Sequence, residues 1–398
     1  MSFIEVNNLF KIFGKNPKKA REMLEEGYSK DQIHSKLRAT VAVNNASLAI
    51  EQGESFVVMG LSGSGKSTLI RCLNRLIEPT SGSVIIDGAD VTRMDQNALQ
   101  DLRRKKISMV FQSFAVFPHR TVLENTAYGL KIRGLPFEER NKKAYETLEM
   151  VGLKGWENSY PDQLSGGMKQ RVGLARALAT EPDILLMDEA FSALDPLIRK
   201  EMQNELIELQ NAMRRTIVFI THDLDEALKI GDRIALMKDG AIVQIGTPEE
   251  ILMTPASNYV EKFVEDVDLS RVLTAEMVMN KPITVVTFPK DGPRVALRSM
   301  WENGISSVFA VDSSFRLQGI VMAEDALQAV EQNQKDLTQI LNRDISTVTP
   351  DTVLKDLFSL LAGKNLPLAV VNDENRLLGI VVRGSVMAKL AEGGEAND

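Results

Sequence analysis

Residues 60–68 read Gly-Leu-Ser-Gly-Ser-Gly-Lys-Ser-Thr and match the phosphate-binding loop pattern G-x-x-x-x-G-K-[ST]. The apolar run 55–59 before the loop is typical of a buried strand, and residues 69–76 after it continue as a helix. Glycines let backbone N–H groups surround a triphosphate, and the start of a helix adds the positive end of its dipole. Lys66 is expected to contact the β- and γ-phosphates, and the Ser67 hydroxyl to hold Mg²⁺. The stretch therefore predicts a nucleoside triphosphate site rather than a chance glycine-rich turn.

The composition predicts a globular chain of two or three domains over its 398 residues. Apolar residues make up 44% and charged residues 25%, and a net charge of −7 argues against a nucleic-acid partner. Cys72 is the one cysteine, which excludes an internal disulfide and suits a reducing cytosol. We expect neither a signal peptide nor a membrane span, because no apolar run approaches the ~18 residues that a span needs.

Strands alternate with helices along the first part of the chain. Residues 2–13 alternate in polarity in the manner of an edge strand, and 83–95 resemble a hairpin. Further buried strands are predicted at 107–112, 184–189 and 216–220, and helices at 121–153, 169–179 and 197–213. Strands and helices that alternate around a phosphate loop predict an α/β domain with a parallel sheet.

Polar side chains lie at the ends of three of these strands. Asp188 is expected in the second coordination shell of Mg²⁺, and the adjacent Glu189 is placed to polarise the attacking water as general base. His222 can contact the γ-phosphate and hold that water. The Gln112 amide can ligate Mg²⁺ or the water and sense the γ-phosphate. Each residue alone is common in loops, but their ordered occurrence after a phosphate loop predicts a catalytic site.

These motifs together resemble the ATP-binding cassette (ABC) family, across residues 3 to about 250. The matching set is the loop 60–68, Gln112, Leu164-Ser165-Gly166-Gly167-Met168, Asp188-Glu189, Ser192-Ala193-Leu194-Asp195 and His222. The Leu-Ser-Gly-Gly stretch is the discriminating element, because phosphate-loop proteins in general lack it. The resemblance implies a parallel sheet core, an antiparallel β subdomain and a helical subdomain.

The resemblance also implies a head-to-tail homodimer that encloses two ATP molecules. It assigns ATP binding within one chain to Phe13, Gly60, Ser62, Gly63, Ser64, Gly65, Lys66, Ser67, Thr68 and Gln112, with Phe13 stacking on adenine in preference to Phe10. The second copy would contribute Leu164, Ser165, Gly166, Gly167 and Asp195. It assigns catalysis to Lys66, Gln112, Glu189 and His222, and Mg²⁺ to Ser67, Gln112 and Asp188. Residues 111–125 are similar to the importer version, in which a separate membrane subunit docks.

Residues 15–40 depart from the cassette pattern. They predict two short helices, the second with a capping box of Ser29 and Gln32, and carry seven Lys/Arg against four acids. A basic side chain near anionic lipid contributes roughly 1 kcal/mol, and salt shortens the Debye length from about 8 Å at 0.15 M to about 3 Å at 1 M. The segment is either a solvated helical hairpin or a salt-sensitive membrane contact. The candidates for that contact are Lys15, Lys18, Lys19 and Arg21.

An internal repeat follows the cassette domain, for which we predict the range 1–255 with a linker over 256–275. Residues 308–321 recur as 368–381. They resemble tandem cystathionine-β-synthase (CBS) modules, at about 276–334 and 335–391, in a smaller α/β domain followed by an acidic tail, 392–398. Such modules often bind adenosine-containing ligands through a Ser/Thr and an Asp. At the Ser/Thr positions this chain has Met322 and Val382, and at the Asp positions it has Asp325 and Ser385. Only Asp325 matches, which leaves open a different ligand, such as a cyclic dinucleotide, or a dimerisation role.

The whole combination resembles the energy-coupling subunit of glycine betaine/proline-type osmoprotectant importers. This implies an ATPase that needs Mg²⁺, transmembrane permease subunits and a substrate-binding protein or domain. It also implies a peripheral position on the cytoplasmic face of a prokaryotic cell membrane, with ionic strength and a module ligand as regulators. The alternatives are an importer of choline, carnitine or an amino acid, a soluble non-transport ABC ATPase, and an adenylate-sensing regulatory protein.

Overall fold

The computed structural model describes residues 2–112, 115–265, 273–361 and 366–386. Its contacts divide the chain into two compact units, Met1–Val264 and Glu265–Asp398. The last helix of the first unit, α12 (Asn258–Val264), ends directly before that division. Part of the predicted linker 256–275 and all of the predicted tail 392–398 lie outside the described residues.

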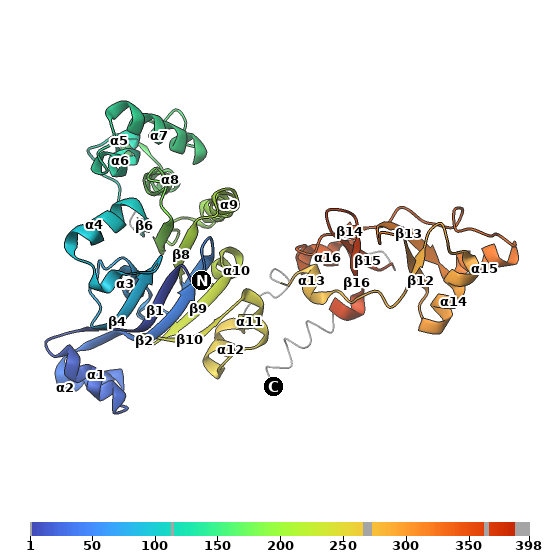
Figure 1. The fold of residues 1–398 in the computed structure, drawn as a ribbon, viewed down its shortest axis with the longest axis horizontal. Helices are drawn as coiled ribbons and strands as arrows, with labels where there is room; N and C mark the ends of the chain where they lie inside the picture. The colour runs from blue at the N-terminus through green and yellow to red at the C-terminus, as the bar shows by residue number, and fades with distance from the viewer. Residues whose placement is uncertain (1, 113–114, 266–272, 362–365, 387–398) are drawn as a thin grey trace. The chain divides into compact units, whose positions relative to one another are not determined.

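A six-stranded sheet forms the centre of the first unit (Figure 1). Its strands are β3 (Ser55–Met59), β6 (Ile107–Phe111), β7 (Ile184–Asp188), β8 (Thr216–Thr221), β9 (Arg233–Lys238) and β10 (Ala241–Gly246). The order is β10-β9-β3-β8-β7-β6, and all neighbours are parallel except β10 and β9. β3, β7 and β8 are buried throughout, because helices and the second sheet pack against them. The predicted parallel core is confirmed.

A second, antiparallel sheet has the order β2-β1-β4-β5. Its strands are β1 (Ile4–Phe13), β2 (Thr40–Ile50), β4 (Ser81–Ile86) and β5 (Ala89–Asp90). The prediction of an edge strand at 2–13 is wrong, because β1 pairs with both β2 and β4. Alternating polarity reports which face of a strand is buried and not how many neighbours the strand has. Ile4 and Leu9 of β1 share one core with Phe56 and Ile220 of the central sheet.

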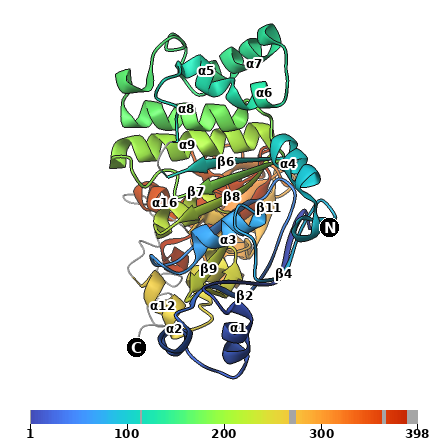
Figure 2. The ribbon, with the colours of Figure 1, turned by 90° about the vertical axis from the view of Figure 1, so that its left-hand side faces the viewer.

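Helices surround the central sheet and form a separate helical region. Those that flank the strands are α3 (Lys66–Leu73), α4 (Gln96–Lys105), α9 (Pro196–Met213), α10 (Leu224–Ile230) and α11 (Pro248–Met253). The helical region holds α5 (Val122–Thr126), α6 (Tyr128–Ile132), α7 (Phe137–Met150) and α8 (Gly166–Leu178), and Figure 2 shows α8 beside α9. Helix α8 begins earlier than predicted, inside the Leu-Ser-Gly-Gly stretch, because the Ser165 side chain caps it.

Residues 15–40 form a helical hairpin with a small core of its own. It consists of α1 (Pro17–Glu25) and α2 (Lys30–Leu37). Gln32 N donates to Ser29 Oγ at 3.3 Å and Ser29 N donates to Gln32 Oε1 at 2.9 Å, which confirms the predicted capping box. Met23 and Ile33 are buried with Ile12 of β1 and Val41 of β2. The hairpin is therefore anchored to the two strands that flank it.

The second unit repeats one motif. Its strands are β11 (Val285–Thr287), β12 (Ser307–Val311), β13 (Leu317–Met322), β14 (Thr347–Val348), β15 (Leu368–Val371) and β16 (Leu377–Val381). Its helices include α13 (Ala275–Val278), α14 (Pro293–Asn303), α15 (Ala323–Glu331) and α16 (Leu354–Leu361). The segments that precede the motifs cross over, since Asn280 pairs with Ile380 and Asn342 with Ile320. This exchange ties the two modules together.

Candidate functional site

The phosphate loop joins β3 to α3, as the sequence predicts. Gly60, Gly63 and Gly65 have φ angles of +144°, +80° and +103°. A Cβ on Gly60 would lie 2.2 Å from the Met237 carbonyl oxygen, and one on Gly65 would lie 2.1 Å from that of Ala42. Gly60 and Gly65 are therefore required both by their backbone conformation and by the close approach of another segment.

Lys66 lies over the loop. Its Nζ donates to the carbonyl oxygens of Gly60 at 2.8 Å and Leu61 at 3.1 Å, and the residue is buried. Burial lowers the pKa of Lys66, and the carboxylates of Glu189 and Asp188 oppose that shift. The ammonium group thus lies between the loop carbonyls and the acidic end of β7.

The loop fits a phosphate group. Across the described residues, no side chain caps the first N–H groups of α3, which leaves the start of this helix open to an anion. The Ser64 hydroxyl is buried, and none of the residues that the structure describes forms a hydrogen bond with it. A buried hydroxyl without a partner is costly, so a ligand oxygen at this place would stabilise the loop.

Gln112, Glu189 and His222 come together at the carboxyl ends of β6, β7 and β8. Gln112 Nε2 donates to Glu189 Oε2 at 3.1 Å and to Ser192 Oγ at 3.2 Å, and His222 Nδ1 lies 3.9 Å from the same Glu189 oxygen. Glu189 has a φ of +47°, a strained conformation for a non-glycine residue that costs about 1–3 kcal/mol and is typical of functional sites. The three residues chosen from the sequence therefore form one cluster, to which the structure adds Ser192.

Asp188 has a partner that the sequence analysis did not select. Arg71 of α3 donates to Asp188 Oδ2 from Nη2 at 2.8 Å and from Nε at 3.2 Å. Arginine is common in helices, so nothing in the local pattern distinguishes Arg71 from a surface residue. The contact depends on how α3 packs against β7, which only the three-dimensional structure shows.

Phe13 ends β1 with its side chain exposed, at 43%. Lys11 Nζ lies 4.7 Å from the centre of the Phe13 ring and also donates to the Glu78 carbonyl oxygen at 2.7 Å. Phe10 is buried, with the Arg21 guanidinium 5.0 Å from its ring. Phe13 rather than Phe10 can therefore stack against a planar ligand.

The Leu-Ser-Gly-Gly stretch lies at the N-terminus of α8, apart from the phosphate loop of the same chain. Ser165 Oγ accepts from Met168 N at 3.3 Å, and Leu164 is buried. In the part of the chain that the structure describes, a Cβ on Gly166 would meet no atom within 4 Å. Asp195 caps α9 by accepting from two backbone N–H groups at 3.1 and 3.2 Å. Among the described residues, no hydrogen bond or ion pair joins this stretch or Asp195 to the phosphate loop of the same chain.

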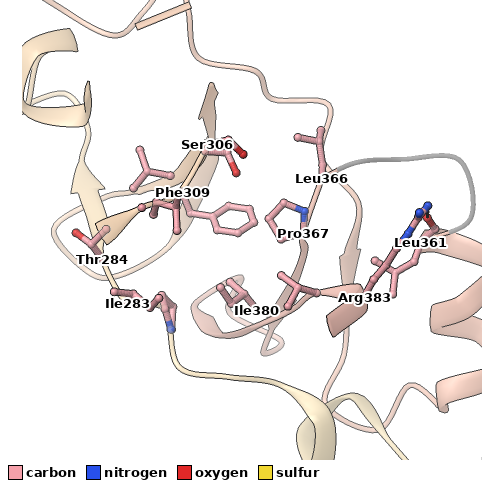
Figure 3. A pocket seen from close by; sticks show the side chains of 15 residues that line it. Ile283, Thr284, Ser306, Phe309, Leu361, Leu366, Pro367, Ile380 and Arg383 are labelled. Atoms are coloured by element: carbon pink, nitrogen blue, oxygen red, sulfur yellow. Dashed lines mark hydrogen bonds between the residues drawn. The ribbon is translucent and has the colours of Figure 1, made fainter. Parts of the chain in front are cut away.

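A cavity of about 480 Å³ lies between the two modules of the second unit (Figure 3). Thr284, Ser306 and Phe309 line it from the first module, and Pro367 and Arg383 line it from the second. Figure 3 shows the Phe309 ring directed toward Pro367. The lining combines apolar side chains with the hydroxyls of Thr284, Ser306 and Ser307 and the Arg383 guanidinium.

Of the four family positions compared in the sequence, Met322, Asp325, Val382 and Ser385, only Val382 lines this cavity. Asp325 is exposed on α15 and does not line the cavity. Val382 does line it but has no hydroxyl, and the Ser385 hydroxyl instead donates to the Val382 carbonyl oxygen at 2.8 Å. The residue singled out from the sequence, Asp325, is thus separate from the cavity.

Comparison with known proteins identifies the family. The ABC transporter model matches residues 43–192, and the CBS domain model matches residues 337–392. The glycine betaine transport ATP-binding protein OpuAA of Bacillus subtilis (strain 168) is 58% identical over 98% of this chain and 93% of its own length. The chain belongs to the ATP-binding proteins of ABC transporters. Such proteins are ATPases, and this ABC subunit binds and hydrolyses ATP.

Another relative and a solved structure support the same family. The glycine betaine/proline betaine transport ATP-binding protein ProV of Salmonella typhimurium (strain LT2) is 49% identical over 98% of both chains. The dimeric post-hydrolysis structure of the ATP-binding cassette MJ0796, bound to ADP and Pi, has a TM-score of 0.53 and 34% identity, and covers 62% of this chain and 98% of that one. ATP-binding subunits of ABC transporters work as dimers with membrane permease subunits. None of the described helices of this ABC subunit has the length and apolar character of a membrane span.

Proposed function

We propose that the chain powers the import of glycine betaine or proline betaine by hydrolysing ATP for a membrane permease. The observation that carries this proposal is full-length similarity to transport proteins for these solutes, at 58% and 49% identity. A choline transport ATP-binding protein of Bacillus subtilis is 38% identical over 87% of this chain, which favours betaine over choline. The solute itself would be bound by the permease and a substrate-binding protein or domain.

In the proposed hydrolysis, Glu189 accepts a proton from the attacking water. Gln112 and His222 lie on the Glu189 carboxylate and would hold it and the water in position. Lys66 would exchange its loop carbonyls for the β- and γ-phosphates of ATP. Ser67, Gln112 and Asp188 would hold Mg²⁺, which supplies positive charge to the phosphate oxygens when bound.

The second copy of a head-to-tail dimer would complete each site with Leu164, Ser165, Gly166, Gly167 and Asp195. The absence of bonds between the Leu-Ser-Gly-Gly stretch and the phosphate loop among the described residues supports a role in trans. In this proposal α8 directs its N-terminal N–H groups at the γ-phosphate held by the other copy.

Gly166→Ala tests that arrangement. A Cβ on Gly166 would have no atom of the described residues within 4 Å, so the free energy of unfolding should change by less than about 0.5 kcal/mol. If the second copy's ATP packs on Gly166, ATPase activity should fall about tenfold or more, with an unchanged melting temperature and unchanged ATP binding by the monomer. Gly167→Ala is the contrasting variant, because its Cβ would lie 2.5 Å from Ile198 Cγ2 and should destabilise the chain itself. Full activity in Gly166→Ala would argue against the role in trans.

The transported solute is tested with the ABC subunit reconstituted with its permease in lipid vesicles. ATP hydrolysis is measured with glycine betaine, proline betaine, choline, carnitine and a neutral amino acid, each added on the side of the substrate-binding protein or domain. The proposal predicts stimulation by the two betaines at the lowest concentrations. If choline, carnitine or the amino acid stimulates hydrolysis instead, the assignment as a transport ATPase stands and the proposed substrate is wrong. If neither a solute nor the permease changes the rate of hydrolysis, a soluble non-transport ATPase is favoured.

The proposed location is peripheral, on the cytoplasmic face of a prokaryotic cell membrane, with the 15–40 hairpin near anionic lipid. Lys15, Lys18 and Lys19 are exposed on and before α1, which supports this proposal. Arg21 is engaged within the first unit, since it pairs with Glu25 at 3.1 Å and lies on the Phe10 ring. Arg21 is therefore the weakest of the four candidates.

Neutralising Lys15, Lys18 and Lys19 together to Gln should lower the KCl concentration that activates hydrolysis in anionic vesicles, because fewer charges remain to be screened. Each lysine would contribute roughly 1 kcal/mol to the membrane-held state. Glu22→Gln is the control of opposite sign, because Glu22 is exposed on the same helix, and it should raise that concentration. An unchanged salt threshold in the triple variant contradicts the membrane contact.

We also propose that the second unit regulates transport through a module ligand, either a cyclic dinucleotide or another nucleotide. The 480 Å³ cavity supports a ligand, and the position of Asp325 outside it argues against binding in the usual adenylate mode. Equilibrium dialysis of the full chain against AMP and a cyclic dinucleotide, with a non-hydrolysable ATP analogue saturating the phosphate loop, tests this. If the full chain retains neither AMP nor the cyclic dinucleotide while the ATP analogue fills the phosphate loop, these nucleotides are excluded as module ligands.

A further inference from the structure

Arg71 connects the helix that follows the phosphate loop to the strand that carries Asp188. Its Nη2 and Nε both reach Asp188 Oδ2, at 2.8 and 3.2 Å. Hydrogen bonds between two ionised groups are short and about twice as strong as neutral ones. The pair therefore fixes the position of a carboxylate that the proposed ATP site uses.

The surroundings of Asp188 leave its charge dependent on Arg71. The Asp188 side chain is only 4% exposed, whereas the Arg71 side chain is 43% exposed. Lys66, the other cation nearby, donates to loop carbonyls at 2.8 and 3.1 Å instead. Among the described residues, Arg71 is thus the cation in direct contact with Asp188, and a buried carboxylate without such a partner is costly.

The adjacent carboxylate is held in a different way. Glu189 accepts from the neutral amide of Gln112 at 3.1 Å and lies 3.9 Å from His222 Nδ1. Neither of these contacts brings an arginine or lysine to Glu189. Lys66 interacts with Glu189 through space, and more strongly than with Asp188, but it donates its hydrogen bonds to loop carbonyls. Of the two neighbouring acids, the one expected near the metal is therefore the one in direct contact with an arginine.

We propose that Arg71 is a positioning residue that neutralises Asp188 when no metal is bound and competes with Mg²⁺ for that carboxylate. This inference rests on the ATP site proposed above. A cation paired with Asp188 opposes the binding of a second, divalent cation, and the metal weakens the Arg71 pair by the same factor. Because the guanidinium is partly exposed, it has room to withdraw into solvent. Arg71 therefore sets the Mg²⁺ concentration at which ATP binds tightly.

The test measures equilibrium binding of a fluorescent ATP analogue to the full chain, in EDTA and across a Mg²⁺ titration. The quantity of interest is the dissociation constant without metal divided by that with saturating metal. Arg71→Gln keeps an amide donor and removes the charge, so this ratio should rise about tenfold. Arg71→Lys keeps the charge, so its ratio should stay within about twofold of the wild-type value. Arg93→Gln removes an exposed arginine that pairs with Asp90 at 3.2 Å and should leave the ratio unchanged.

A ratio that is unchanged or lower in Arg71→Gln overturns the inference, because a purely structural role would weaken binding equally with and without metal. A ratio moved by more than about twofold in Arg71→Lys also overturns it, even if Arg71→Gln does not fold. A wild-type chain that binds the analogue equally well with and without Mg²⁺ would contradict the proposed ATP site, and this inference with it.

Discussion

Replacing Glu189 by Gln is expected to lower kcat for ATP hydrolysis by about 10²- to 10⁴-fold and to leave ATP binding nearly unchanged. The amide has the shape of the carboxylate and can still bond to the Gln112 side chain, but it cannot accept a proton from water. The measurement is a pair of values for each protein, kcat from phosphate release and the dissociation constant for ATP.

The matched control is Glu226→Gln. Glu226 is also an acid near the end of a central strand; it accepts from Gln203 Nε2 at 3.1 Å, and burial raises its pKa. It has no role in the proposed site, so its replacement should leave kcat within about twofold. If Glu189→Gln kept more than about a tenth of the wild-type kcat, Glu189 would not be the general base.

Gly65→Ala is expected to abolish detectable ATP binding and to destabilise the first unit by about 2–5 kcal/mol. Gly65 has a φ of +103°, and an added Cβ would lie 2.1 Å from the Ala42 carbonyl oxygen of β2. Backbone at that distance cannot move without disturbing the pairing of β1 and β2. The measurement is thermal unfolding of the full chain together with ATP binding.

Gly63→Ala distinguishes backbone strain from the steric clash with Ala42 as the cause of the loss in Gly65→Ala. Gly63 lies in the same loop with a φ of +80°, but an added Cβ would have no atom of a described residue within 4 Å. This variant should show only the backbone strain, about 1–2 kcal/mol, and should bind ATP more tightly than Gly65→Ala does. Equal losses in both variants would mean that the close approach to Ala42 is not what requires glycine at position 65.

Much of the site could be predicted because its residues lie at the ends of strands that the sequence marks clearly. Parallel strands bring their carboxyl ends to one edge of a sheet, so Gln112, Glu189 and His222 had to be neighbours once their strands were recognised. Their mutual contacts in the structure agree with that reasoning. Their catalytic roles remain predictions.

What could not be predicted depends on packing between distant segments. The polarity of β1 gave no sign that it has a neighbour on each side, because alternation reports only the buried face. The sequence around Arg71 does not distinguish it from other helix arginines, because its contact with Asp188 depends on the packing of α3 against β7. Asp325 matched a family position, yet it does not line the 480 Å³ cavity between the two modules.

The most direct test of the central proposal is uptake of labelled glycine betaine into right-side-out vesicles. These vesicles enclose ATP and Mg²⁺, carry this ABC subunit on the inner face of the permease, and have the substrate-binding protein or domain outside. The proposal predicts ATP-dependent accumulation with the wild-type chain and none above the ATP-free level with Glu189→Gln. Hydrolysis of ATP without any accumulation of a betaine would contradict it.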